Sequence, residues 1–224
     1  MRLTAIAGHR IWASSYDASP NPLLALETRV LLGRLRIFEG CRFLDVACGT
    51  GRWMQFARQR GAQVFGTDLC PEMLQQASRK PSLRGNLSLA DACRVPFADG
   101  IADFTFCSFA LSYVASPLEA IAEMARVTRK GARVVVTDLH PSALAAGWTR
   151  SFRANGELYE IDHHSHSAEA WEGAAESAGL LLDWRADANF AEPEREIFRQ
   201  VGKDSSFSEL SRIPAVLAMC WIKS

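Results

Sequence analysis

Asp45 and the glycines that follow it are the residues of this chain whose types and spacing best suit ligand binding. Residues 43–46 read as a buried strand, and Gly49 and Gly51 come directly after it. Glycines at this spacing let the backbone turn sharply and keep side chains away from a bound ligand. The helix that opens after the turn points its free amide groups at the same place. This pattern is typical of a site for a nucleotide-type cofactor.

Two classes of nucleotide-type cofactor use such a turn. On this motif alone, a generic glycine-rich turn without a ligand is the alternative to a cofactor site. A dinucleotide site has a third glycine three residues after the second, where this chain has Met54, and it has no use for Asp45 inside the strand. An acid two residues before Ala47, with Gly49-x-Gly51 following, resembles the first motif of the class I S-adenosylmethionine-dependent methyltransferases. That family usually has glycine where this chain has Ala47, and the extra methyl group can narrow the room beside the methionine part of the cofactor.

A second acid ends the next predicted strand. Residues 63–68 are a short apolar run that ends in Asp68, and Pro71 then opens a helix. Parallel strands end at the same edge of a sheet, so Asp68 is expected beside the glycine turn, where a carboxylate can accept both hydroxyls of a ribose. Leu69 and Met73 are expected to flank the adenine. The alternative for Asp68 is an acid that only stabilises a helix N-terminus.

The resemblance continues in order and spacing to about Asp138. Asp91-Ala92 is similar to the family's Asp-Ala step, in which the acid accepts from the adenine amino group and the next amide donates to the ring. Residues 95–100 match the connector that follows. The resemblance implies S-adenosylmethionine as the cofactor and S-adenosylhomocysteine as the product. It also implies a set of cofactor contacts, which are Tyr16, Asp45, Ala47, Gly49, Gly51, Asp68, Leu69, Met73, Asp91, Ala92 and Ser108.

The alternation of strands and helices from residue 42 to 138 predicts an α/β fold. We expect a Rossmann-like, mostly parallel sheet of seven strands, with helices on both faces and an antiparallel last strand at 213–222. Helices are expected at 22–36, at 117–129 with a C-cap at Lys130-Gly131, and after Ser167 as an N-cap. One domain (1–224) is expected, with an N-terminal arm and helix (1–40), a cofactor-binding core (41–138), a substrate lid (139–166) and a C-terminal helix and strands (167–224).

The composition narrows the class of partner and compartment. Lys plus Arg and Asp plus Glu both number 25, so the net charge of zero argues against a nucleic-acid partner held by its phosphates. Six cysteines without a C-x-x-C pair indicate buried, reduced thiols. The apolar stretch at the N-terminus is too short for a signal peptide, and no run approaches the length of a membrane span. A cytoplasmic protein without a membrane partner is expected, as a monomer or a homodimer.

Catalytic candidates come from the segments that flank the core. His140 follows the strand 132–138 at the cofactor edge, and His166 lies in a histidine-rich stretch; either imidazole could take a proton from the acceptor. The alternative is that both only hold the lid by hydrogen bonds. Tyr16 lies in an arm that resembles one that closes over the cofactor, or it is a surface aromatic packed on a helix. The spacing of His163, His164 and His166 suits no helix face, so no metal site is expected.

Together these features predict methyl transfer from S-adenosylmethionine to an oxygen or nitrogen atom of a small molecule. The protein would align the reactants for an in-line displacement and exclude water, with a histidine base adding a modest factor. Enzymes that methylate DNA bases or protein glutamine have an Asn/Asp-Pro-Pro-aromatic step where this chain has Ser108-Phe109, which argues against that class of substrate. Aromatic residues in the arm and lid suit a planar acceptor, or they belong to the core. A protein that binds the cofactor without transferring methyl (a sensor or a silent partner subunit), a C-methyltransferase and an NAD-linked oxidoreductase are the alternatives.

Overall fold

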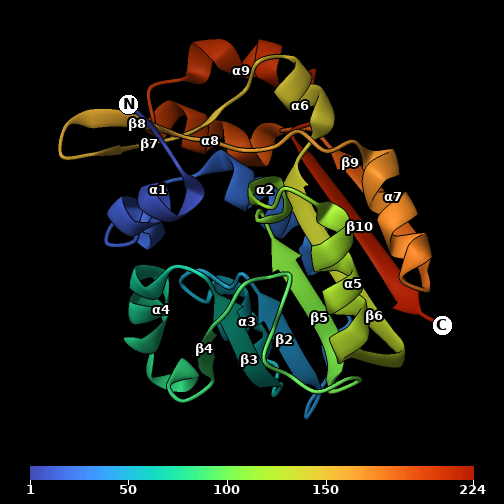
Figure 1. Ribbon diagram of the computed structural model, residues 1–224. Coiled ribbons are helices and arrows are strands. Elements are labelled where there is room, and N and C mark those ends of the chain that lie inside the picture. The colour runs from blue at the N-terminus through green and yellow to red at the C-terminus, as the bar shows by residue number, and fades with distance from the viewer.

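A seven-stranded sheet forms the centre of the protein (Figure 1). The computed structural model describes residues 1–224. β10 is antiparallel to both of its neighbours, and the other paired strands are parallel. The predicted fold class is confirmed. From edge to edge the strands are β4 (Leu87–Leu89), β3 (Gln63–Asp68), β2 (Arg42–Val46), β5 (Ala102–Ser108), β6 (Thr128–Leu139), β10 (Val216–Lys223) and β9 (Leu180–Ala188).

Helices cover both faces of this sheet (Figure 1). One apolar core lies between the sheet and α2 (Pro22–Leu32), α3 (Arg52–Arg58) and the C-terminal helices α8 (Glu192–Gln200) and α9 (Asp204–Leu210). A second core lies between the opposite face and α5 (Pro117–Val127) and α7 (Ala168–Ser177). α4 (Pro71–Ser78) packs beside β3 and β4 at one edge. Both faces of the central strands are therefore buried, which explains their nearly continuous apolar sequence.

Side chains at the helix starts explain where the helices begin. Asn21 accepts a hydrogen bond from the amide of Leu23 at 2.9 Å, and Pro22 occupies the first turn of α2. Ser167 accepts from the amide of Ala170 at 3.2 Å, so the predicted N-cap of α7 is confirmed.

Helix ends differ from the prediction where tertiary contacts intervene. α2 ends at Leu32, four residues before the predicted end. α5 ends at Val127 because Thr128 joins the sheet, where its hydroxyl lies 2.6 Å from that of Thr105 in β5. Lys130-Gly131 therefore belongs to the irregular start of β6 and does not cap a helix. The last strand begins at Val216 and not at residue 213.

A second, smaller sheet was not predicted. It has the order β1 (Arg2–Leu3), β8 (Glu157–Ile161) and β7 (Arg150–Ala154), and the turn Asn155-Gly156 has φ values of 51° and 82°, which suit a tight hairpin. α1 (Ala5–Trp12) packs on it so closely that a Cβ on Gly8 would lie 2.8 Å from Ile161. This sheet and α1 lie beyond the carboxyl ends of the central strands (Figure 1). The role of residues 139–166 as a substrate lid stays a prediction.

Gly51 is the position of the glycine turn that tolerates a side chain least. Its φ of 80° is left-handed, and a Cβ would lie 2.5 Å from the buried Leu83. Gly51→Ala is expected to lose about 1–2 kcal/mol of stability from the backbone and about 1–3 kcal/mol more from the clash. Gly40→Ala is the matched control, because Gly40 has φ 79° with no neighbour within 4 Å. Equal losses in chemical denaturation of the two variants would contradict this contact.

The cysteines and the helices bear on the predicted compartment. All six cysteines are free thiols, and five of them are buried. None of the helices combines the length and the apolar character that a membrane crossing needs. Location in the cytoplasm stays a prediction.

Candidate cofactor and substrate cavity

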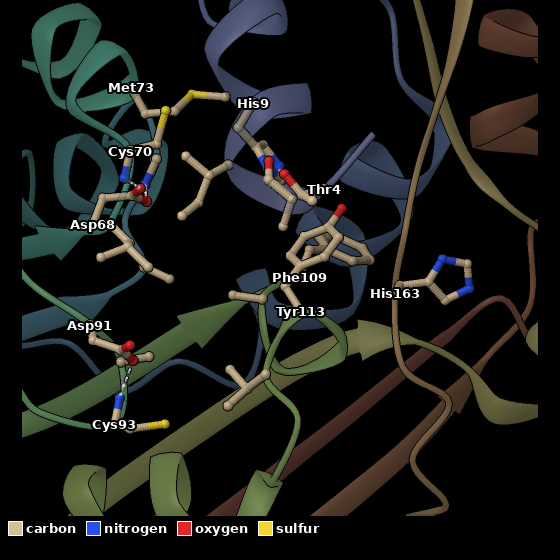
Figure 2. Close-up of a pocket in the computed structure, with 18 of the residues that line it drawn as sticks. Thr4, His9, Asp68, Cys70, Met73, Asp91, Cys93, Phe109, Tyr113 and His163 are labelled. Atoms are coloured by element: carbon tan, nitrogen blue, oxygen red, sulfur yellow. Dashed lines mark hydrogen bonds between the residues drawn. The ribbon is translucent and has the colours of Figure 1, made fainter. Parts of the chain in front are cut away.

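A cavity of about 680 Å³ opens at the carboxyl ends of β2, β3 and β5, beneath α1. Its volume falls within the range of small-molecule sites. Asp68 and Asp91 lie on one side of it, and Phe109 and Tyr113 lie opposite (Figure 2). The structure brings most of the predicted cofactor residues to its wall, namely Tyr16, Ala47, Gly49, Asp68, Leu69, Met73, Asp91, Ala92 and Ser108.

The glycine turn forms the floor of the cavity at the end of β2. Ala47, Gly49 and Gly51 all have positive φ, at 58°, 55° and 80°. A Cβ on Gly49 would meet nothing within 4 Å, so its backbone faces open space. Gly51 lies behind the turn, as the N-cap of α3, and does not line the cavity. Ala47 holds a left-handed conformation that L-residues adopt at some cost, which is consistent with a site that needs this backbone path.

Asp68 is fixed by the turn itself. One carboxylate oxygen accepts from the amide of Gly49 and the other from the amide of Cys70, each at 2.8 Å. Burial raises the pKa of Asp68, and these amide hydrogen bonds oppose the shift. A carboxylate oxygen can accept a second hydrogen bond, so both oxygens can still receive ribose hydroxyls.

Asp45 lies behind the turn and does not line the cavity, so a direct cofactor contact is not supported by its placement. Its side chain is buried, and its Oδ1 atom has no hydrogen-bond partner. Burial raises the pKa of Asp45 well above its usual range; Arg52 opposes this, and the Glu27 and Asp68 carboxylates add to it. Burial without a hydrogen-bond partner therefore favours the neutral, protonated form of Asp45.

Asp45 is expected to make stability depend on pH. Because its folded-state pKa is raised, the folded protein binds more protons than the unfolded chain, so stability falls as pH rises above the unfolded value of about 3.9. Asp45→Asn removes this penalty. The variant should match the wild type near pH 4 and melt at a higher temperature at pH 8. A difference in stability between Asp45→Asn and the wild type that stays constant from pH 4 to pH 8 would show that the pKa of Asp45 is not raised in the folded protein.

His140, the first candidate for a general base, does not line the cavity. Its Nδ1 atom accepts from the amide of Ser142 at 3.0 Å, which caps the short helix α6 (Pro141–Ala145). Its Nε2 atom lies 2.7 Å from Oδ1 of Asp187, on β9. Both ring nitrogens are engaged and the residue does not line the cavity. His140 therefore positions the chain between β6 and β7.

His166 also lies outside the cavity. Its Nε2 atom is 2.8 Å from the carbonyl oxygen of Val114 and must donate to it. This bond holds the segment before α7 against the loop after the 3₁₀ turn η3 (Leu111–Tyr113). The placement of His166 favours the structural alternative.

The acceptor half of the cavity is lined by residues of α1 and its N-cap, of η3 and of the segment after β8. Tyr113 is one of the aromatic residues that the sequence suggested for an acceptor pocket, and His163 and His164 belong to the histidine-rich stretch. Thr4 and His9 also line this half, and the sequence did not single them out. Thr4 accepts from the amide of Ala7 at 3.4 Å, so an N-cap signal for α1 was present in the sequence. The sequence indicated that the arm around Tyr16 approaches the cofactor, but the placement of Thr4 and His9 depends on the pairing of β1 with β8.

Comparison with known proteins agrees with this geometry. A family model described as "Methyltransferase domain" matches residues 44–136. The demethylmenaquinone methyltransferase of Beutenbergia cavernae is 37% identical over 175 residues, which cover 70% of this chain and 71% of that protein. The chain belongs to the class I S-adenosylmethionine-dependent methyltransferases. S-adenosylmethionine is the cofactor of this family.

Other relatives of this methyltransferase chain differ in length. The malonyl-[acyl-carrier protein] O-methyltransferase of Serratia marcescens is 36% identical over 158 residues, which cover 69% of this chain and 57% of that protein. The chain spans about half the length of several curated relatives that it matches. A putative S-adenosylmethionine-dependent methyltransferase from Listeria monocytogenes has the same fold, with a TM-score of 0.71 at 19% identity over 90% of this chain and 99% of that one.

Arg150 ties the small sheet to the methyltransferase core. Its guanidinium pairs with the buried carboxylate of Asp138 at the end of β6, and its Nη1 atom donates to the carbonyl of Phe109 at 3.3 Å. It also lies 5.1 Å from the ring centre of Phe109 and 5.0 Å from that of Tyr113. Asp138 in turn accepts from the amide of Ser112 at 2.8 Å. These contacts fix the two aromatic rings at the wall of the cavity.

Proposed function

We propose that the protein transfers a methyl group from S-adenosylmethionine to an oxygen or nitrogen atom of a small, uncharged acceptor. One observation carries the proposal: a single cavity joins the strand-end residues Asp68 and Asp91 to a half lined by α1 and η3. The first part suits an adenosine, and the second leaves room for an acceptor beside it. A binding protein without transferase activity has no need of that second half.

The charge of the cavity wall argues against an anionic acceptor. The lining residues include four carboxyl groups, those of Asp68, Asp91, Glu119 and Asp162, and no lysine or arginine. Arg150 lies behind the wall and is neutralised by Asp138. A carboxylate or diphosphate group would be buried here without a cation to pair with, which is costly. This contrasts with relatives whose names specify malonyl-[acyl-carrier protein] or geranyl diphosphate.

The residues of the chain would act mainly by alignment and by exclusion of water. Asp68 would hold the ribose, Asp91 the adenine, and the Ala47–Gly49 turn the methionine part. When bound, S-adenosylmethionine supplies an electrophilic methyl group on a positively charged sulfur. Aromatic rings near this charge favour it, and Tyr16 and Phe109 line the same cavity. Burial raises the pKa of Tyr16 to about 12, so its phenol stays neutral at pH 7 and is unsuited to act as a base.

Methylation of a ring carbon is a second candidate. The similarity to demethylmenaquinone methyltransferase favours it, because the aligned region covers 70% of this chain and 71% of that protein. An aromatic hydroxyl compound would suit both reactions, because loss of its proton activates the oxygen and the adjacent ring carbon alike. Mass spectrometry and NMR of the product distinguish the two sites of methylation.

Calorimetric titration followed by an acceptor screen tests the proposal. S-adenosylmethionine and S-adenosylhomocysteine should bind with micromolar affinity, and NADH should not bind. The screen then uses labelled S-adenosylmethionine with phenols and amines, each paired with an analogue that also carries a carboxylic acid. Transfer to the compound without the carboxylate in each pair supports the proposal. Binding of both sulfur ligands without transfer to any acceptor would favour a sensor or silent subunit, and binding of NADH alone would overturn the proposal.

A further inference from the structure

His9, in the N-terminal helix α1, reaches the acceptor half of the cavity. Figure 2 shows it extending from the helix towards the space that Phe109 and Tyr113 also line. Its ring lies edge-on to that of Tyr113, with 5.0 Å between the ring centres. The helix that carries it is fixed to β8 by the close contact between Gly8 and Ile161. The position of the imidazole is thus set by two packed elements.

The hydrogen bonding of His9 determines which ring nitrogen carries the proton. Its Nδ1 atom lies 2.8 Å from the carbonyl oxygen of Ala5. A carbonyl oxygen can only accept, so Nδ1 must donate, and the neutral ring keeps its lone pair on Nε2. Nε2 has no hydrogen-bond partner in the protein. It is not one of the fully buried unpartnered atoms, so it is accessible from open space.

The surroundings of His9 keep it neutral. Burial lowers the pKa of His9 to about 4; the hydrogen bond to Ala5 opposes this shift, and the Arg150 guanidinium adds to it. At pH 7 the ring is therefore a neutral acceptor. Other titratable or charged groups on the elements around it include Arg10, Tyr16, Cys70, Glu72, Tyr113, Arg153, Glu157, Tyr159, Glu160, Asp162, His163 and His164.

We propose that Nε2 of His9 is the general base that takes the proton of a neutral hydroxyl acceptor during methyl transfer. This inference rests on the proposed function. As the acceptor's lone pair forms the new bond to the methyl carbon, the bond from that carbon to sulfur breaks, and its electron pair stays on sulfur. The O–H electron pair returns to the acceptor oxygen, and the proton passes to Nε2 of His9. The positive charge so moves from sulfur to the imidazolium, which releases its proton to water when the product leaves.

A weakly basic imidazole is adequate for this step. A hydroxyl becomes strongly acidic as its oxygen forms a third bond, to the arriving methyl carbon, so the proton transfer is downhill even to a base of low pKa. The opposite tautomer would present an N–H to the acceptor and could not take the proton. The tautomer fixed by Ala5 is therefore the property on which the proposal depends.

Two variants test this role, one in the cavity and one far from it. His9→Gln removes the base from the cavity, whereas Glu176→Gln changes an exposed residue of α7 outside it. With a hydroxyl acceptor found in the screen, His9→Gln should lower kcat by roughly 100-fold or more, while the affinity for S-adenosylhomocysteine stays unchanged. Glu176→Gln should keep the wild-type kcat. If His9→Gln does not fold by circular dichroism, His9→Asn replaces it, because its amide can still donate to Ala5.

A second readout does not need an acceptor. In protein labelled with ¹⁵N-histidine, long-range ¹H–¹⁵N correlation reports the tautomer of each ring, and the His9 signals are those lost in the His9→Gln variant. An unprotonated Nε2 on His9 at pH 7, with and without S-adenosylhomocysteine, is the expected result. A proton on Nε2, or wild-type kcat in the His9→Gln variant, would overturn the proposal. Failure of the wild type to bind the sulfur ligands would instead overturn the proposed function, whatever the tautomer of His9.

Discussion

Glu27→Ala is expected to lower the free energy of unfolding by about 3–5 kcal/mol, since it breaks a buried charged network. The Glu27 side chain, on α2, is fully buried. One carboxylate oxygen accepts from the hydroxyls of Ser108, at 2.7 Å, and Thr137. The other accepts from the guanidinium of Arg52 and from the indole N–H of Trp53, at 3.2 Å. Removal of the carboxylate leaves four donors without their acceptor.

The stability of the Glu27 variants can be measured by thermal unfolding. For a domain of this size the loss corresponds to a fall in Tm of roughly 6–20 °C. Glu27→Gln should lose less, because its amide keeps one oxygen that can accept. Glu176→Ala is the control, since Glu176 is an exposed residue of a helix, and it should change stability by no more than about 0.5 kcal/mol. A Tm of Glu27→Ala equal to that of this control would show that the hydrogen bonds of Glu27 do not stabilise the fold.

Asp68→Ala is expected to weaken binding of S-adenosylmethionine by roughly 10–100-fold, because hydrogen bonds to a charged group contribute about 1.5–3 kcal/mol. Asp68 lines the cavity at the end of β3, and both of its oxygens are already oriented by the amides of Gly49 and Cys70. The ribose would meet a carboxylate that needs no reorganisation. The effect should appear in the dissociation constants of both S-adenosylmethionine and S-adenosylhomocysteine, since the two share the ribose.

The controls for Asp68 separate ribose binding from general charge. Asp68→Asn keeps one carbonyl oxygen and should give an intermediate affinity. Asp162→Ala removes an acid from the other half of the same cavity and should leave the affinity for S-adenosylhomocysteine unchanged. Calorimetry at fixed ionic strength measures all three variants. Wild-type affinity in Asp68→Ala would remove Asp68 from the cofactor site.

The cofactor half of the cavity was predictable because its residues come from local patterns that a parallel sheet brings together. Asp68 ends β3 and Asp91 follows β4, while Ala47 and Gly49 follow β2, the neighbour of β3 on its other side. Parallel pairing places such residues at one edge whatever the rest of the chain does. Strand ends and glycine spacing do not distinguish Asp45 and Gly51, which lie behind the turn, from the residues that line the cavity.

The histidines show where local reasoning fails. His140 leaves β6 at the expected edge, yet Asp187 on β9 and the amide of Ser142 take up both of its ring nitrogens. His9 carried no signal in the sequence, because it reaches the cavity only through α1. Glu27 would be assigned to the polar side of an amphipathic helix, yet polar groups from β5, β6 and α3 meet it in the interior.

By itself the sequence determined the α/β fold, the family and the edge of the sheet where the cofactor residues gather. These follow from periodicity, glycine spacing and strand ends, which act over a few residues. Only the tertiary structure decided which side chains face the acceptor, because that depends on pairing across the whole chain. Arg2 and Leu3 pair with Glu160 and Ile161, and this parallel pairing brings α1 to the cavity. Such long-range contacts depend on the shape and packing of the complete core, which no local pattern encodes.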